Sequence, residues 1–517
     1  MQRSMTTRLA MHTALAMSFL LGSLSLAVAG EDARSGLRLD LRVAQAGTPP
    51  TGGTGVLALS LRDSIALALR NNLDIAVETF TPRIREQDLT GEKAVFDPSA
   101  FLEATRSDSR FPSTFAFTRG SNVSDLWDYN AGIRQKLPTG GTYEFRFNNE
   151  RLNTTPDWSD GFSSQLMLTL SQPLLKNFGF EANETGIRVA TNNQAISKEQ
   201  LRLKVSDIAT QVQNAYYELI FAIENLEVQR RSLRLAQDLV TLNKARVRAG
   251  VAAPVEVTQA EAQEAARVQD VILAEKAVRD GEDTLKVVLN VPAGSGWGQE
   301  IQLTDTPGFE PTAIDLTESI QKALENRYEV KSAKLDIENR ELSARLTRNQ
   351  LLPDLSLTAS LSTNGAGGRY GGDVSELGSS HFVSYSVGAI LTVPLGNRAA
   401  ESSYVKAKLG VDQARTSVKQ LELQIIQQVR EGVRRIEADA KRIEANRAAR
   451  ALAEEQLRVE QRRLEAGVTT TFNVLSFQRD LAVAQANEIR AIADYNKSQA
   501  NLEKVRGTVL ERHKIEM

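Results

Sequence analysis

The sequence predicts an α+β membrane protein that is built from two internal repeats and combines membrane-spanning strands with very long helices. Three observations lead to this fold class. Motifs recur in the same order at fixed offsets, apolar residues recur every seven positions over about 65 residues, and uncharged segments alternate apolar with small polar side chains. Together they predict a coiled-coil helical barrel joined to a transmembrane β-barrel that several chains share.

The composition excludes several classes of function. With no cysteine among 517 residues, disulfide bonds, thiolate metal sites and cysteine nucleophiles are excluded. The three histidines are His12 in a predicted signal peptide, His381 in a polar loop and His513 five residues from the end. The formal net charge of −2 offers no basic surface for nucleic acid. We therefore expect no enzyme, no cofactor, no metal and no nucleic-acid partner.

The N-terminus has the three parts of a secretory signal peptide, over residues 1–29. Met1–Arg8 is positively charged, Leu9–Leu26 is mostly apolar, and Ala27-Val28-Ala29 fits the cleavage pattern. An uncleaved N-terminal anchor is the alternative. Residues 30–56 read as a flexible tether. No later stretch approaches the ~18 apolar residues of a spanning helix, so the mature chain is either soluble or crosses a membrane as strands.

Two pairs of motifs define the internal repeats. Leu61–Asn71 recurs as Leu316–Asn326 at an offset of 255, and Arg246–Val251 recurs as Arg463–Val468 at an offset of 217. The first pair predicts an opening helix in each repeat, and the glycine of the second pair predicts a tight turn between two helices. The predicted units are a first repeat at 57–290, an inter-repeat linker at 291–313 and a second repeat at 314–511.

Each repeat is predicted to contain three helical segments. A seven-residue apolar spacing predicts one continuous helix over about 184–249 and another over about 398–466. Shorter helices are expected at 254–290 and 470–510, after the glycine turns. The opening helices are expected near 60–93 and 315–351, where Pro82 predicts a kink or a register break in the first one.

The second repeat contains two segments that are typical of transmembrane strands, Leu355–Ser362 and Val383–Val393. Both lack charge and place small polar side chains on one face, and a glycine-rich loop joins them. The first repeat has an additional hairpin, Tyr129–Leu137 with Tyr143–Asn148, which makes six candidate strands, four of them before Pro173. Aromatic residues near the strand ends fit an interfacial belt: Trp127, Trp158, Phe162 and Phe382.

The order of the duplicated helices, hairpins and Ala-Gly-Val turns resembles that of the TolC-like outer-membrane efflux protein family, over about residues 57–511. Further markers are Leu352-Pro353-Asp354-Leu355, Gln172-Pro173-Leu174 and Val393-Pro394-Leu395. The resemblance implies a homotrimer with a shared barrel in outer-membrane lipid and a helical tube in the periplasm. It also implies a passive exit duct for an inner-membrane pump, joined through a periplasmic adaptor (membrane fusion) protein.

The resemblance also implies functional residues at the periplasmic tip. Family members narrow the tube there with acidic residues, which makes Glu256, Leu464, Asn473 and Ser476 the candidate gate. Of these only Glu256 retains an acid, and the alternative is a solvated residue that favours a helix start. The candidate adaptor-docking turns contain Arg246, Gly250, Val251, Arg463, Gly467 and Val468.

The main alternative function is a periplasmic coiled-coil scaffold or adaptor protein with a soluble β-domain. An enzyme ranks last, because the carboxylates are scattered over predicted coiled-coil surfaces. The sequence leaves open the exported substrate and whether the pump is proton-driven or ABC-type. It also leaves open whether the hairpin Tyr129–Asn148 joins the barrel or folds over its rim.

Overall fold

The computed structural model describes residues 42–43, 56–112, 121–155, 161–292, 297–311, 313–379 and 381–516. They form one compact unit, Arg42–Glu516. The predicted signal peptide, most of the predicted tether and Trp158 lie outside the described residues. None of the helices in the described ranges has the length and hydropathy of a membrane-spanning helix.

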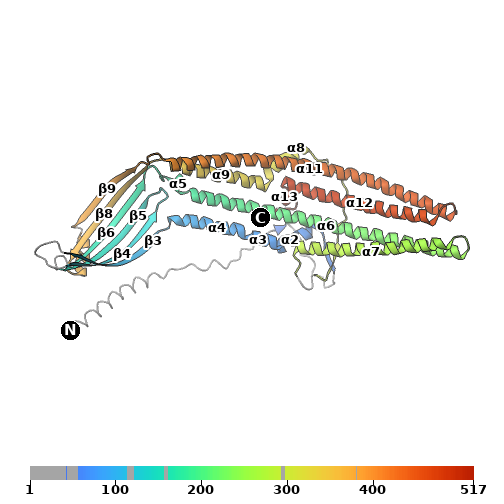
Figure 1. Ribbon diagram of the computed structural model, residues 1–517, viewed down its shortest axis with the longest axis horizontal. Coiled ribbons are helices and arrows are strands. Elements are labelled where there is room, and N and C mark those ends of the chain that lie inside the picture. Colours follow the sequence, from blue (N-terminus) through green and yellow to red (C-terminus); the bar gives the residue numbers. More distant parts are fainter. Residues whose placement is uncertain are drawn as a thin grey trace, which may run out of the picture. The chain divides into compact units, whose positions relative to one another are not determined.

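Six long strands form one antiparallel sheet, in the spatial order β3-β4-β5-β6-β8-β9 (Figure 1). The six predicted strands are therefore confirmed. The strands are β3 (Ser99–Pro112), β4 (Ser121–Lys136), β5 (Thr142–Thr155), β6 (Gly161–Pro173), β8 (Asp354–Gly367) and β9 (Val383–Thr392). The additional hairpin is β4–β5, and it lies in the middle of the sheet, hydrogen-bonded to β3 on one side and to β6 on the other.

The helices lead away from this sheet and pack side by side (Figure 1). The long helix α6 contacts α4, α7, α9 and α12, and the second long helix α11 contacts α8, α9 and α12. The helices of this layer are α4 (Phe80–Lys93), α6 (Thr185–Arg248), α7 (Pro254–Leu289), α8 (Leu316–Asn326), α9 (Tyr328–Asn349), α11 (Arg398–Glu465) and α12 (Thr471–Arg506). One edge of the layer is thus formed by α4 and α7, and the other by α11.

The seven-residue seams are buried in both long helices, as predicted. In α6, Val205, Val212 and Leu219 are fully buried, and in α11, Val429 and Ile443 are fully buried. The continuous helices expected at 184–249 and 398–466 are confirmed, with 64 and 68 residues. Towards the end of α6 the seam shifts, because Leu233 and Val247 are only half-buried. The buried residues there are Ser232, Ala236, Leu239, Asn243 and, of the predicted seam, Val240.

The opening helices are interrupted, which corrects the expectation of about 35 continuous residues. The first is divided into α2 (Leu61–Asn71), α3 (Leu73–Glu78) and α4. Asn72 has extended backbone geometry, and its side chain accepts hydrogen bonds from the backbone N–H groups of Asp74 and Ile75, so that it caps α3. A second break at Thr79, three residues before Pro82, is the predicted effect of that proline.

Short strands and helices connect these layers. In the segment expected as a tether, β1 (Arg42–Val43) pairs with β10 (Ile515–Glu516), and the expected linker contains β7 (Glu300–Leu303), which pairs in parallel with β2 (Val56–Leu59). None of these four short strands was predicted. Each is four residues or shorter, too short for an alternation pattern. The remaining elements are η2 (Ala94–Phe96), α5 (Phe180–Asn183) and α13 (Val509–Arg512).

The glycine-rich loop expected between the last two strands contains a helix, α10 (Tyr370–Ser379), which packs against β6 and β8. Asp373 in this helix is fully buried and accepts a 2.7 Å hydrogen bond from Ser164 of β6. A Cβ atom at Gly365 would lie 2.0 Å from the carbonyl oxygen of Asp373. Gly365, one of the glycines that suggested a loop, therefore provides space for α10 to approach the sheet.

Candidate functional site

The sheet has one predominantly apolar face. The strand register aligns alternate residues across all six strands, so that Leu102, Ile133, Phe145, Leu168 and Leu361 project to the same side. These side chains are 45–68% exposed, and Tyr385 and Val387 on the same face of β9 are exposed by 81% and 71%. These side chains form an exposed apolar band across the six strands, and beyond it the same face has charged residues such as Arg106, Asp125 and Arg151. An apolar band of this extent is typical of a surface that contacts lipid.

The opposite face is polar and is divided into a neutral part and a charged part. On β6, β8 and β9 it has neutral residues, mostly serine, threonine, asparagine and glutamine, apart from Asp354 at the start of β8. An amide ladder crosses it, since Asn148 donates to Gln165 and Gln165 donates to Asn364, at 3.0 and 2.8 Å. The charges of this face lie mostly on the hairpin β4–β5 and on β3.

Two helical tips end the layer of helices, the α6–α7 turn and the α11–α12 turn. Gly250 has a φ of +75° and Gly467 a φ of +73°, which are left-handed backbone conformations that favour glycine. In both turns the N–H of the following valine donates a 3.0 Å hydrogen bond back to an arginine carbonyl, from Val251 to Arg246 and from Val468 to Arg463. The two turns are therefore the same helix-ending motif, as the repeated sequence predicts.

A buried polar cluster joins the two tips. The Thr471 hydroxyl lies 2.7 Å from Glu256 Oε2 and 3.1 Å from Asn243 Oδ1, and Thr471 and Asn243 are both fully buried. Asn243 also donates to the backbone carbonyl of Glu256, at 3.3 Å. Arg246 approaches the Glu256 carboxylate to 4.0 Å. We call Asn243, Glu256, Thr471 and Arg246 the tip cluster.

The α11–α12 tip has a related arrangement around Glu460. This buried carboxylate accepts a hydrogen bond from Thr469 and forms an ion pair with Arg463 at 3.1 Å. At the offset of 217, Glu460 corresponds to Asn243. Sequence reasoning missed Asn243, Glu460 and Thr471, although comparing positions at that offset would have paired the first two.

The structure brings only one of the four candidate gate residues into the tip cluster. Glu256 is in it, with 24% of its side chain exposed. Leu464 is buried in an apolar core with Leu457 and Val474, Asn473 is exposed and donates to Thr469, and Ser476 accepts from Arg479. The assignment of these residues to a gate remains a prediction.

The docking turns expose apolar side chains in matching pairs. Val251 and Val468 are 67% and 65% exposed. Val255 and Phe472, which correspond at the same offset, are 57% and 63% exposed. Each tip therefore presents two uncovered apolar side chains beside its glycine.

A second polar cluster lies near the C-terminal end of α12. Glu503 is buried beside Arg512, with which it forms an ion pair, and its Oε2 atom has no hydrogen-bond partner in the part of the chain that the structure describes. Burial raises the pKa of Glu503 to about 7, against the opposing effect of Arg512. Burial likewise lowers the pKa of His513 to about 4, and its imidazole Nε2 lies 3.0 Å from the side-chain nitrogen of Gln213.

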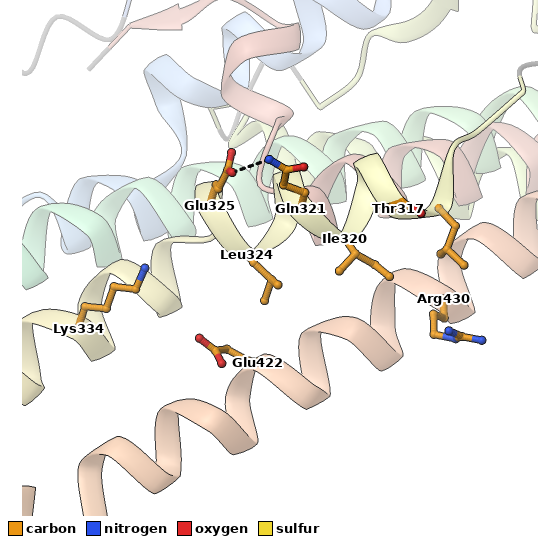
Figure 2. A pocket seen from close by; sticks show the side chains of 9 residues that line it. Thr317, Ile320, Gln321, Leu324, Glu325, Lys334, Glu422 and Arg430 are labelled. Atoms are coloured by element: carbon orange, nitrogen blue, oxygen red, sulfur yellow. Dashed lines mark hydrogen bonds between the residues drawn. The ribbon is translucent and has the colours of Figure 1, made fainter. Parts of the chain in front are cut away.

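An open groove separates α8 from α11, with a volume of about 580 Å³ (Figure 2). Its floor contains Ile320 and Leu324, and charged residues such as Glu422 and Arg430 surround it. At the offset of 255, these two residues correspond to Ile65 and Leu69 of the first repeat, which are buried. Within the described parts of the chain, no group of three His, Cys, Asp or Glu residues could hold a metal ion.

The sheet has one apolar and one polar face, and it continues into long helices that end in paired tips. These features define the class of the protein, a membrane protein with an extended helical part. The comparisons with known proteins agree. The family model described as outer membrane efflux protein matches residues 65–291 and again residues 319–508. The chain belongs to this family, and it is an outer-membrane efflux channel whose helical part lies in the periplasm.

Individual relatives are distant. The chain is 25% identical to the outer membrane protein TolC of Vibrio cholerae over 384 residues, which cover 71% of this chain and 81% of that protein. It is 23% identical to nodulation protein T of Rhizobium leguminosarum bv. trifolii over 341 residues, covering 64% and 69%. The solved structure of the outer membrane protein VceC of Vibrio cholerae has a TM-score of 0.63 at 18% identity, covering 86% and 96%, which shows that the fold is shared.

Proposed function

We propose that the chain is the outer-membrane component of a tripartite export system and acts as a homotrimer. Substrates delivered by an inner-membrane pump, through a periplasmic adaptor protein, leave the cell by diffusion through the trimer. The chain itself performs no catalysis and binds no cofactor. Family membership supports the channel over the periplasmic scaffold that the sequence left as the alternative.

The observation that carries this proposal is the pair of open sheet edges. Among the described strands, β3 and β9 each have only one neighbour in the six-stranded sheet. The six strands alternate in direction, so β3 and β9 of one chain run in opposite directions. If copies lie side by side in a ring, β9 of one copy therefore runs antiparallel to β3 of the next. Exposed strand edges pair with other strands unless they are covered, so these edges favour a closed ring of copies.

The helical layer has edges that fit the same arrangement. On one edge, Phe80 and Ile84 of α4 are 57% and 58% exposed, and Ile272 of α7 is 60% exposed. On the other edge, Leu409 and Leu423 of α11 are 62% and 68% exposed. Packing α11 of one copy against α4 and α7 of the next would bury both sets, which supports assembly through the helices as well as the strands.

Three copies of the six-stranded sheet would close an eighteen-stranded barrel. Barrels of about 16–18 strands leave an aqueous channel. The apolar face would then contact outer-membrane lipid, and the polar face would line the pore. The additional hairpin is thereby proposed as part of the barrel wall.

The remaining assignments belong to the same proposal. Residues 1–29 direct secretion, 30–56 form the N-terminal tether, and 57–290 and 314–511 are two repeats joined by 291–313. The twofold match of one family model supports the repeats. The tips at Gly250 and Gly467 dock the adaptor, and Glu256 lies at the gate, with Leu464, Asn473 and Ser476 as further candidates.

Disulfide crosslinking of the strand edges tests the assembly, because the chain has no native cysteine. Val387→Cys in β9 is combined with single cysteines along β3, such as Leu102→Cys, in cells that export the protein. We expect crosslinked dimers and trimers from the outer-membrane fraction. The matched control pairs Leu102→Cys with Leu168→Cys in the central strand β6, which should give monomers. Recovery in the soluble periplasm without crosslinks would overturn the proposal.

A further inference from the structure

Charged side chains on the polar face of the sheet lie mostly on the additional hairpin and β3, in two groups. Asp128 and Glu150 lie opposite each other further along the hairpin, and a larger group lies at the end nearer the helices. At that end the face has Arg134 and Lys136 on β4, Glu144 and Arg146 on β5, and Glu103 on β3. The cross-strand neighbours of Arg134, Glu144 and Arg146 on β6, β8 and β9 are serine, threonine and methionine. The hairpin therefore adds charge to a face that is otherwise mostly neutral.

These side chains are held in place by contacts within the cluster. Arg146 Nε lies 2.8 Å from Glu144 Oε1, and a second guanidinium nitrogen lies 3.8 Å from Glu103 Oε2. The same guanidinium lies 4.9 Å from the centre of the Phe101 ring, and that of Arg134 lies 5.8 Å from it. Cations at these distances are attracted to the face of an aromatic ring.

Gly132 explains why Phe101 can occupy the centre of the cluster. A Cβ atom at this position would lie 2.5 Å from the Phe101 ring. Only glycine therefore lets the ring lie flat across β4, between the two arginines on neighbouring strands. The charged end of the hairpin is a packed arrangement rather than a set of independent side chains in solvent.

The cluster has an excess of positive charge. It contains three cations and two carboxylates, and both carboxylates lie beside Arg146. Among the described residues, Arg134 and Lys136 form no ion pair; Arg134 donates to the Ser99 hydroxyl at 3.4 Å, and Lys136 lies 5.9 Å from the Phe96 ring. Within the described residues, Arg134 and Lys136 thus have no carboxylate at ion-pair distance, and Asp128 and Glu150 on the same face lie six register positions from Arg134 and Glu144.

We propose that Arg134 and Lys136 form a positive collar at one level of the pore that raises the permeability of the open channel to small anions relative to small cations. The inference rests on the proposed trimer, in which three copies would place six such cations around one axis. Rings of charged side chains determine the ion preference of pores, because they raise the local concentration of the oppositely charged ion. The additional hairpin is then a selectivity element as well as a part of the wall.

The test measures reversal potentials in planar bilayers under a potassium chloride gradient. At about 0.1 M salt the Debye length is ~10 Å, so a collar still acts on ions in a wide pore. We expect the doubly substituted variant Arg134→Gln, Lys136→Gln to lower the chloride-to-potassium permeability ratio by at least about twofold. Glu103→Gln should raise the same ratio, because it removes a negative charge from the cluster.

Arg151→Gln is the matched control, since Arg151 lies on β5 but projects to the opposite face, beside the Phe162 ring. Its permeability ratio should equal that of the unmodified channel. The collar is refuted if the double variant forms channels with an unchanged ratio, or if the control shifts the ratio equally. An absence of channels from the unmodified protein would instead contradict the proposed function. Neither Arg134 nor Lys136 has an ion pair with another described residue to lose, so the double variant is expected to assemble.

Discussion

Thr471, at the start of α12, donates a 2.7 Å hydrogen bond to the carboxylate of Glu256, at the start of α7. Thr471 is fully buried and Glu256 is mostly covered, so this bond joins two helical tips that are 215 residues apart in sequence. Separating the α6–α7 tip from the α11–α12 tip requires this bond to break. The tip cluster is therefore a local determinant of how firmly the periplasmic end is held together.

Thr471→Val tests the tip cluster by removing the hydroxyl while keeping the shape of the side chain. The only proton of the hydroxyl is lost, so the mostly covered Glu256 carboxylate loses its 2.7 Å donor and the nearby Asn243 oxygen loses a polar contact, which costs about 1–3 kcal/mol. We expect faster amide hydrogen exchange at both tips and unchanged exchange in the sheet. Thr241→Val is the control, because its exposed hydroxyl bonds only to a carbonyl one turn earlier in α6. Equal exchange in both variants would contradict a joining role for Thr471.

Glu256→Gln separates the charge of the tip cluster from its hydrogen bonding. The amide oxygen of glutamine can still accept from Thr471, but three negative charges would be lost from the proposed trimer. We expect a lower single-channel potassium conductance and weaker block by multivalent cations in planar bilayers. Glu261→Gln, which removes an exposed carboxylate paired with Lys244, should leave both quantities unchanged. If Glu256→Gln behaves in the same way, Glu256 only favours the start of α7.

The long helices and strands could be predicted because the same spacing of apolar residues recurs many times along each of them. A seven-residue apolar spacing over nine helical turns or more leaves few alternatives, and both long helices begin and end within two residues of the predicted bounds. Alternation over ten residues likewise predicted the strands. Short elements such as β7, with four residues, have no such redundancy, and their formation depends on a partner strand more than 200 residues away.

The candidate site was less predictable, because its residues act through tertiary contacts. The sequence placed Glu256 beside the glycine turn, but Thr471 looked only like a helix start and Asn243 like one polar position in a coiled coil. Their contact requires two hairpins from different repeats to meet. The packing of Leu464 was not predicted either, since this position, named for a pore constriction, lies in an apolar core with Val474.

The two tip glycines allow a clean measurement of backbone strain. A Cβ atom at Gly250 or Gly467 would meet no heavy atom within 4 Å, but both residues have a positive φ. Alanine there should lower the free energy of unfolding by about 1 kcal/mol, from backbone strain alone. Gly91→Ala in α4 also has open space but ordinary helical geometry, so it should stabilise by up to about 1 kcal/mol. Thermal unfolding of the purified variants would contradict this account if all three shifted in the same direction.

Glu503 predicts a loss of stability as the pH rises through neutrality. Its pKa is about 7 in the folded chain and 4.5 when unperturbed, so in this interval the folded state holds a proton that the unfolded state has released. Stability falls as the pH rises through this window. His513, with its pKa lowered from 6.5 to about 4, acts in the opposite direction, mainly between pH 4 and 6.5 and with a smaller remainder up to about pH 7.5.

A comparison of the wild-type chain with Glu503→Gln isolates the Glu503 contribution, because both proteins keep His513. Between pH 6.5 and 7.5 the wild-type chain should lose up to about 1 kcal/mol of unfolding free energy per copy relative to the variant. Thermal melts across that interval measure the difference. Parallel profiles for the two proteins would mean that Glu503 is ionised throughout, held by Arg512.

The paired apolar side chains of the tips predict where the proposed adaptor would bind. Val251 and Val468 are exposed at equivalent places in the two turns, beside Val255 and Phe472. An aspartate at either valine would place a charge in an apolar contact, so Val251→Asp and Val468→Asp should each weaken adaptor binding at least tenfold, which corresponds to about 1.4 kcal/mol.

Because both valines are exposed and lie in turns, these substitutions should leave trimer assembly and conductance in bilayers unchanged. Val287→Asp is the matched control, since this residue of α7 is 62% exposed but lies near the opposite end of that helix from Val255. Export in cells and copurification with the adaptor measure the effect. The docking assignment fails if both tip variants retain full export and copurification, because two of its four apolar contacts would then be dispensable.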